Sequence, residues 1–106
     1  MSITKTFFPD KGVCKVLFTL PESATNHSDK VSVVGDFNDW NPEINLMEKD
    51  NNGQFNCTID LPLGKVYEFR YLIDNSLWVN EWDADAYSPT PYGGEYNMIL
   101  SCVIPG

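Results

Sequence analysis

The sequence predicts an all-β fold, an antiparallel β-sandwich of immunoglobulin-like type with about seven or eight strands. Three observations support this class. Short runs alternate between apolar and polar residues, as half-buried strands do. Turn signals rich in Gly, Pro, Asn and Asp separate these runs at the roughly 8–12-residue spacing of a sandwich, and no run has the apolar period of a helix. The 106 residues fit a single domain, residues 1–106, and a hydrophobic fraction of 42% is enough for a core.

The first half of the chain contains two clear strand patterns. Val13–Leu20 alternates, with every second residue apolar, and Val31–Gly35 follows a polar, turn-rich stretch. The loop Asp36–Pro42 comes next, and we predict a short strand over Glu43–Glu48. Lys49–Gly53 then forms a hairpin turn, because Asn and Gly tolerate positive φ.

The second half contains further strands and an irregular stretch. Gln54–Leu61 and Val66–Ile73 alternate, and an Asp-Asn-Ser turn closes a hairpin into Leu77–Val79. The prolines and glycines of Asn80–Gly94 exclude a long helix, so we predict irregular structure there and a closing strand over Tyr96–Ile104. The alternation predicts that Phe55, Cys57, Ile59, Leu61, Tyr67, Phe69, Tyr71 and Ile73 face inward, and that Asn56, Thr58, Asp60, Glu68, Arg70 and Leu72 face outward.

The charge of the chain argues against anionic partners. Fifteen acidic residues against seven basic ones give a net charge of -8. Phosphate backbones and anionic membrane surfaces would be repelled, so we predict neither a nucleic-acid nor a membrane partner. We find no apolar run as long as a signal peptide or a membrane span, and therefore expect a cytoplasmic protein. Cys14, Cys57 and Cys102 are odd in number and lie in strand-like runs, which indicates small buried hydrophobes in a reducing compartment.

Signals for catalysis are weak. His27 is the only histidine, and no nucleophile signature surrounds it. A sandwich of this size leaves little room for a cleft that encloses two carboxylates with tuned pKa values. The acidic loop residues lack the ligand spacing of a calcium loop. We therefore predict no enzymatic activity, no metal and no cofactor.

The tryptophans are the residues most informative about function. Trp40 stands on a polar loop beside Asn38, and because such loops lie at the surface and carry binding residues, we favour an exposed ring. Trp78 follows a hairpin, where burial and exposure fit equally well, and Trp82 suits a secondary core anchor under the next loop. Flat hydroxylated ligands such as sugars are commonly held by several aromatic rings. If only two rings bind, we expect Trp40 and Trp78.

The order of motifs resembles carbohydrate-binding module family 48, the isoamylase N-terminal or early-set domains, of which the beta subunit of AMP-activated protein kinase carries the best-known relative. The resemblance covers Lys11 to Val103 through CKVLFTLP, VSVVGDFNDWNP, FNCTIDLPLGKVYEFRYLIDNSLW, a Pro-rich loop and NMIL. It implies an early-set, immunoglobulin-like sandwich that binds glycogen or starch. The chain is most similar to small stand-alone bacterial early-set proteins with a W-x-N-x-W-x-A-D-x-Y-x-P-like run, as at Trp78 to Pro89.

The resemblance also implies roles for individual residues. Trp40 and Trp78 would stack on glucose rings, and Arg70 would donate hydrogen bonds to sugar hydroxyls in a planar fork geometry. The family's Leu-Gly-Thr-x-Asn pattern appears here as YGGEY, which starts at Tyr92, and Asn97 follows one residue past it. A shift of one residue in a strand turns a side chain to the opposite face unless a bulge intervenes.

Together these features predict a non-catalytic module that binds α-glucan of the glycogen or starch type by stacking of surface tryptophans. The candidate contact residues are Trp40, Arg70, Trp78, Asn38, Asn97, Tyr92 and Trp82. The alternative is a protein–protein interaction module. In that case the tryptophans and the Pro-rich Ala86–Tyr92 segment would pack against a partner such as a glycan-metabolising enzyme, because aromatic rings are also favoured at interfaces.

Overall fold

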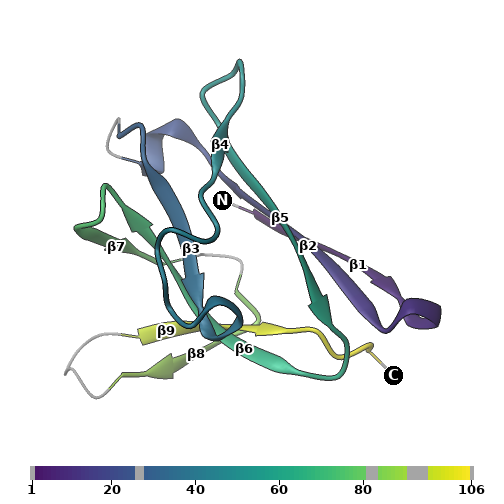
Figure 1. Ribbon diagram of the computed structural model, residues 1–106. Coiled ribbons are helices and arrows are strands. Elements are labelled where there is room, and N and C mark those ends of the chain that lie inside the picture. The colour runs from purple at the N-terminus through teal and green to yellow at the C-terminus, as the bar shows by residue number, and fades with distance from the viewer. Residues whose placement is uncertain (1, 26–27, 81–83, 91–95, 106) are drawn as a thin grey trace.

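The structure of the protein is a computed structural model that describes residues 2–25, 28–80, 84–90 and 96–105. Over these residues the chain forms nine strands in two antiparallel sheets, which lie as separate layers in Figure 1. The strands are β1 (Ser2–Phe8), β2 (Val13–Leu20), β3 (Val31–Gly35), β4 (Glu48–Lys49), β5 (Phe55–Pro62), β6 (Val66–Ile73), β7 (Leu77–Val79), β8 (Ala86–Pro89) and β9 (Tyr96–Ser101). The predicted all-β sandwich is confirmed.

The first sheet has the order β1-β2-β5-β4. β2 and β5 pair over their whole length, from Val13 opposite Pro62 to Leu20 opposite Phe55, so the two strongest alternating patterns lie side by side. β1, which pairs with β2 along the edge of this sheet, is a strand that the sequence pattern did not predict. Its alternation is blurred because Lys5 occupies a position between the partly buried Ile3 and Phe7.

The second sheet has the order β3-β6-β9-β8, and β7 pairs with the second half of β6. β8 lies within the stretch predicted to be irregular, so that prediction is wrong over Ala86–Pro89. Proline is tolerated there because β8 is an edge strand that ends at Pro89. The closing strand β9 ends at Ser101, three residues earlier than predicted.

The segment between the sheets corrects another expectation. No strand spans Glu43–Glu48. Residues 42–44 form a turn, and the strand β4 contains only Glu48 and Lys49. Before β4 the chain bonds to the edge of β3, where Val33 N–H donates to Asn45 O at 3.0 Å and Met47 N–H donates to Val31 O at 2.8 Å. It then crosses to β5 in the other sheet, so neither sheet holds it long enough for a full strand.

The core fills the space between the two sheets. It includes the predicted aromatic row Tyr67, Phe69 and Tyr71 on β6, which packs against Phe18 of β2. Cys14 and Cys102 are fully buried and Cys57 is half-buried, and all three are free thiols. Burial, together with a hydrogen bond to Cys14, raises the pKa of Cys102 to about 12.

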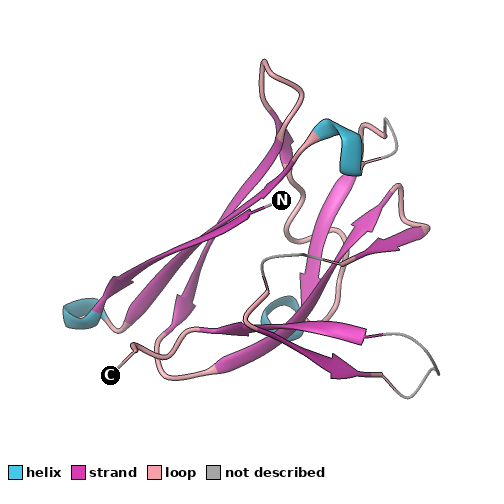
Figure 2. Cartoon of the chain, turned by 180° about the vertical axis from the view of Figure 1, so that it is seen from behind, coloured by secondary structure: helices cyan, strands magenta, loops and turns pink. Residues whose placement is uncertain are grey.

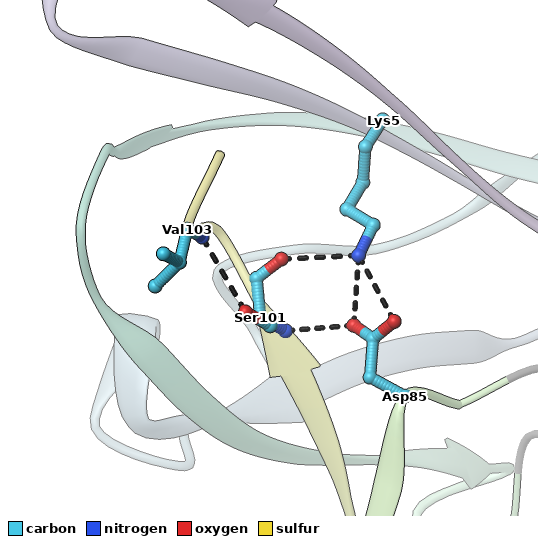
Figure 3. A network of polar contacts seen from close by, with 4 residues as sticks. All are labelled: Lys5, Asp85, Ser101 and Val103. Carbon is cyan, nitrogen blue, oxygen red and sulfur yellow. Dashed lines mark hydrogen bonds and ion pairs between the residues drawn. The ribbon is translucent and has the colours of Figure 1, made fainter. Parts of the chain in front are cut away.

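A polar network ties the two sheets together at the side where β1 faces the C-terminal strands (Figure 3). Lys5 Nζ lies 2.8 Å from Asp85 Oδ2 and donates to Ser101 O at 3.0 Å, and Ser101 N–H donates to the same carboxylate at 2.7 Å. An inward-pointing charge on an edge strand discourages pairing with another chain. Lys5 therefore connects the two sheets, a role that the apolar–polar pattern of β1 could not reveal.

The helical content is limited to short 3-10 turns between strands, at Pro9–Lys11, Glu22–Ala24 and Asp36–Asn38 in the described part of the chain (Figure 2). Among the described residues, none of these helices has the length and apolar character needed to cross a membrane.

Candidate functional site

The candidate site begins where β3 ends, at Gly35. This residue has an extended backbone with φ -171°, which any residue adopts. The constraint is space, because a Cβ built there would lie 2.5 Å from the carbonyl oxygen of Glu68 and 2.8 Å from Cβ of Phe69. Glycine therefore lets β3 approach β6 closely, and the 3-10 turn η3 (Asp36–Asn38) starts against β6 (Figure 1).

Asn38 holds the loop after β3 together from within. Its Nδ2 donates to Val33 O at 2.9 Å and to Asn45 Oδ1 at 2.8 Å, and its Oδ1 accepts from Gly35 N–H at 3.0 Å. The side chain is only 5% exposed. Sequence reasoning placed Asn38 among the ligand contacts, whereas these bonds place it beneath the surface of the loop.

Trp40 lies in this loop with an unusual backbone conformation. Asp39 and Trp40 have φ values of 55° and 57°, in the left-handed region that bulky residues rarely adopt. Trp40 N–H donates to Gly35 O at 2.9 Å, which closes the loop on itself. The indole Nε1–H donates to Asp36 Oδ1 at 3.0 Å, and Asp36 Oδ2 accepts from the backbone N–H of Glu68 at 2.8 Å. The ring of Trp40 is therefore connected to β6 through one carboxylate.

Trp78 reaches the same place from the β6–β7 hairpin. Asp74 and Asn75 have φ values of 53° and 54°, as in a type I′ turn, and Ser76 N–H donates to Ile73 O at 3.0 Å. This turn sets Trp78 opposite Leu72 on the outer face of the sheet. Its side chain is 40% exposed, which answers the question that the sequence left open.

The two tryptophans meet. Their ring centroids are 6.5 Å apart and the ring planes are inclined by 63°, an edge-to-face arrangement that aromatic pairs favour. Trp40, which the sequence predicts to be exposed, is partly buried in this arrangement, and Trp78 is the more exposed ring. We call this pair the tryptophan platform.

Arg70 lies against the tryptophan platform. It faces away from the core as predicted, with its Cζ 5.3 Å from the centroid of the Trp78 ring, and its Nε donates to Asn80 Oδ1 at 3.2 Å. Arg70 is nevertheless only 9% exposed, because its side chain packs against Trp78 instead of reaching away from the sheet. Leu72 is buried on this face as well. Near Trp78, the side chains of β6 on the outer face of the sheet are therefore largely shielded from solvent.

Asn97 extends the polar border of the site along β9. Met98 faces the core opposite Phe69, so Asn97 faces outward, and its Nδ2 donates to Glu68 Oε1 at 3.4 Å. The departure from the family pattern therefore leaves an amide on the outer face. Tyr92 and Trp82, the remaining candidates, lie outside the described residues.

Sequence reasoning missed Asp36, Glu68 and Asn80. Only Asp36 carried a usable signal, because it precedes Trp40 by four residues, at the start of the same short turn. Glu68 and Asn80 join the site through pairing of distant strands. A hollow of about 500 Å³ lies on the other sheet, near Glu48 and Thr58, and neither Trp40 nor Trp78 lines it.

The chemistry of this surface suits a polyhydroxylated ligand. Aromatic rings offer apolar faces of large area, and the amides, carboxylate and guanidinium around them offer directional hydrogen bonds. Over the described residues, the chain is thus an antiparallel sandwich module with a tryptophan pair on one outer face.

The family of that module is known from its sequence. The family model for the glycogen recognition site of AMP-activated protein kinase matches residues 18–100, and the chain belongs to this family. The family is a carbohydrate-binding module, a class of non-catalytic domains. The resemblance found in the sequence is thereby confirmed. Among curated proteins, none matches the chain closely enough to be counted as a relative.

Proposed function

We propose that the protein binds α-glucan chains of the glycogen or starch type, without catalysis, through Trp40 and Trp78. The observation that carries this proposal is the contact between the two indole rings, one from the loop after β3 and one from strand β7, on one sheet face. Membership of a glycogen-recognition family supports the class of ligand.

The two faces of Trp78 have different roles. The guanidinium of Arg70 covers one face at 5.3 Å, so the sugar stacks on the opposite face. Arg70 thus supports the ring and presents little surface of its own. Asn80 and Asn97, at the border of the same face, donate to or accept from sugar hydroxyls.

The affinity for a single site is expected to be weak. Contacts with two rings and a few hydrogen bonds, less the ordering costs of binding, give roughly -4 to -6 kcal/mol, a dissociation constant from about millimolar to tens of micromolar. A polymer with many equivalent sites raises the apparent affinity through rebinding. A glucan-active enzyme that holds the module near its substrate would gain in the same way.

Affinity electrophoresis tests the proposal. Wild type, Trp40→Ala and Trp78→Ala are run in native gels with and without glycogen, and Phe8→Ala serves as a matched control because Phe8 is an exposed aromatic residue on the other sheet. Glycogen should retard the wild type and Phe8→Ala more than the two tryptophan variants. Equal mobility of all four proteins in every gel would overturn the proposal.

A protein-binding role is the second candidate. Tyr87 on β8 and Tyr96 on β9 are 49% and 48% exposed, and exposed tyrosines favour interfaces. Sedimentation and glycogen retention of the tryptophan variants, beside Tyr87→Ala and Tyr96→Ala, separate the two roles. Loss of self-association with no change in glycogen retention would favour this second candidate.

A further inference from the structure

Asp36 stands apart from the other loop residues because its two carboxylate oxygens bond to two different elements. Oδ1 accepts the indole Nε1–H of Trp40 at 3.0 Å, and Oδ2 accepts the backbone N–H of Glu68, in β6, at 2.8 Å. The strand that donates the second hydrogen bond, β6, also carries Arg70, which packs against the ring of Trp78. Asp36 therefore links the ring of Trp40 to the same strand whose Arg70 packs against the ring of Trp78.

The ring of Trp40 needs such a link. Its backbone has a positive φ, and apart from its edge contact with Trp78 the indole is partly open to solvent. An indole rotates about two side-chain bonds, so a partly exposed ring samples several orientations unless a contact selects one. The bond from Nε1–H fixes the rotation of the ring, and the bond from Glu68 N–H fixes the carboxylate that receives it.

We infer that Asp36 is a positioning residue that holds Trp40 in the orientation required to receive an α-glucan, an inference that rests on the proposed function. Asp36 acts through the indole and does not contact the sugar. By holding the ring before the ligand arrives, it reduces the ordering cost of binding.

Asp36→Asn and Asp39→Asn form a matched pair for the test. Both remove one negative charge from the same loop, and Asn tolerates the positive φ of Asp39. An amide at position 36 has a single acceptor oxygen, so one of the two N–H donors loses its partner in either orientation of the amide. Asp39 makes no side-chain hydrogen bond within the described residues, so its replacement leaves the ring in place.

Two readouts separate the positioning role from the proposed function. The first is the hydrogen-exchange rate of the Trp40 Nε1–H in proton–nitrogen NMR spectra, assigned by its absence from Trp40→Phe. The second is the dissociation constant for maltoheptaose by calorimetry, with thermal unfolding as a check on the fold.

We expect Asp36→Asn to exchange the Trp40 indole proton about fivefold faster and to bind maltoheptaose roughly three- to tenfold more weakly, the factor that one hydrogen bond typically contributes. Asp39→Asn should match the wild type in both measurements. Unchanged indole exchange in Asp36→Asn, or equal effects of the two variants, would overturn the inference. If the wild type binds no maltoheptaose and no glycogen, the proposed function fails, whereas the exchange comparison still decides whether Asp36 holds the ring.

Discussion

Replacing Gly35 with alanine tests whether the close approach of β3 to β6 builds the site. The new Cβ would lie 2.5 Å from Glu68 O, 2.8 Å from Phe69 Cβ and 3.0 Å from Phe37 Cε2. Two of these neighbours belong to the backbone or the root of a side chain in a central strand, so they cannot yield without separating the two strands. The backbone at position 35 is extended, so alanine adds no conformational strain there.

The size of the effect follows from this geometry. Overpacking of a well-filled site costs about 1–3 kcal/mol, and contacts with backbone atoms place Gly35→Ala at the upper end, about 3 kcal/mol. For a domain of this size each kcal/mol lowers the melting temperature by roughly 4–8 °C, so we expect a decrease of about 12–24 °C. Urea unfolding, followed by circular dichroism, measures the free energy of unfolding directly.

Gly64→Ala is the matched control. A Cβ at Gly64 meets nothing within 4 Å, but φ is +82°, so the cost there is backbone strain of about 1–2 kcal/mol with no steric part. Gly35→Ala should therefore be the more destabilised variant, and it should also lose glycogen retention, since the loop of Trp40 starts at Gly35. A smaller loss of stability in Gly35→Ala than in Gly64→Ala would refute the packing argument.

Three further predictions follow from the contacts. Partial loss of water raises the pKa of Asp50, but bonds from Asn52 N–H, Gln54 N–H and the Asn56 amide outweigh this and lower its pKa below the usual value. The unfolded chain then binds the proton more readily, so this contribution to stability is present above about pH 4 and is lost as the pH falls further. Urea unfolding between about pH 5 and pH 2 should show a shallower pH dependence for Asp50→Asn, and equal slopes would contradict the assignment. Arg70→Met should weaken maltoheptaose binding roughly three- to tenfold, because Trp78 loses its cation contact and Asn80 its donor. Unchanged affinity in calorimetry would show that Trp78 binds maltoheptaose equally well without its contact with Arg70. In thiol labelling of the native protein at pH 8, we expect Cys57 to react before the other two cysteines. Its reaction should still be slow, because burial and the nearby charge of Glu48 raise the pKa of its thiol. Cys14 and Cys102 should react only on unfolding, because both are fully buried. Rapid labelling of all three thiols would contradict the described core.

The sequence alone determines the class of fold and much of the core. The alternation in Val13–Leu20, Gln54–Leu61 and Val66–Ile73 specifies which side chains face inward, because a strand repeats every two residues and one face must be buried. Turn residues such as Asp74, Asn75 and Gly53 mark where the chain reverses, and these positions have positive φ in the structure. Local rules are sufficient for these features.

Only the tertiary structure decided which strands lie at the edges of the sandwich and which side chains on the outer face are buried. β1 and β8 are edge strands. Lys5 in β1 and Pro89 in β8 obscure the strand pattern, which becomes evident only from the pairing of each strand with its neighbour. Arg70 and Leu72 alternate like outward residues, yet they are buried on the face that carries Trp78. Periodicity identifies the face of a strand on which a residue lies, but it contains no information about what covers that face.

The site itself depends on both levels. The sequence singles out Trp40, because an aromatic ring on a polar loop has little to bury it locally, and it leaves burial and exposure of Trp78 equally open. Only the fold brings the two rings to 6.5 Å and connects Asp36 to the backbone of Glu68, 32 residues away in the chain. Such contacts arise from the register of β3 against β6, and strand register is set by the packing of the whole core.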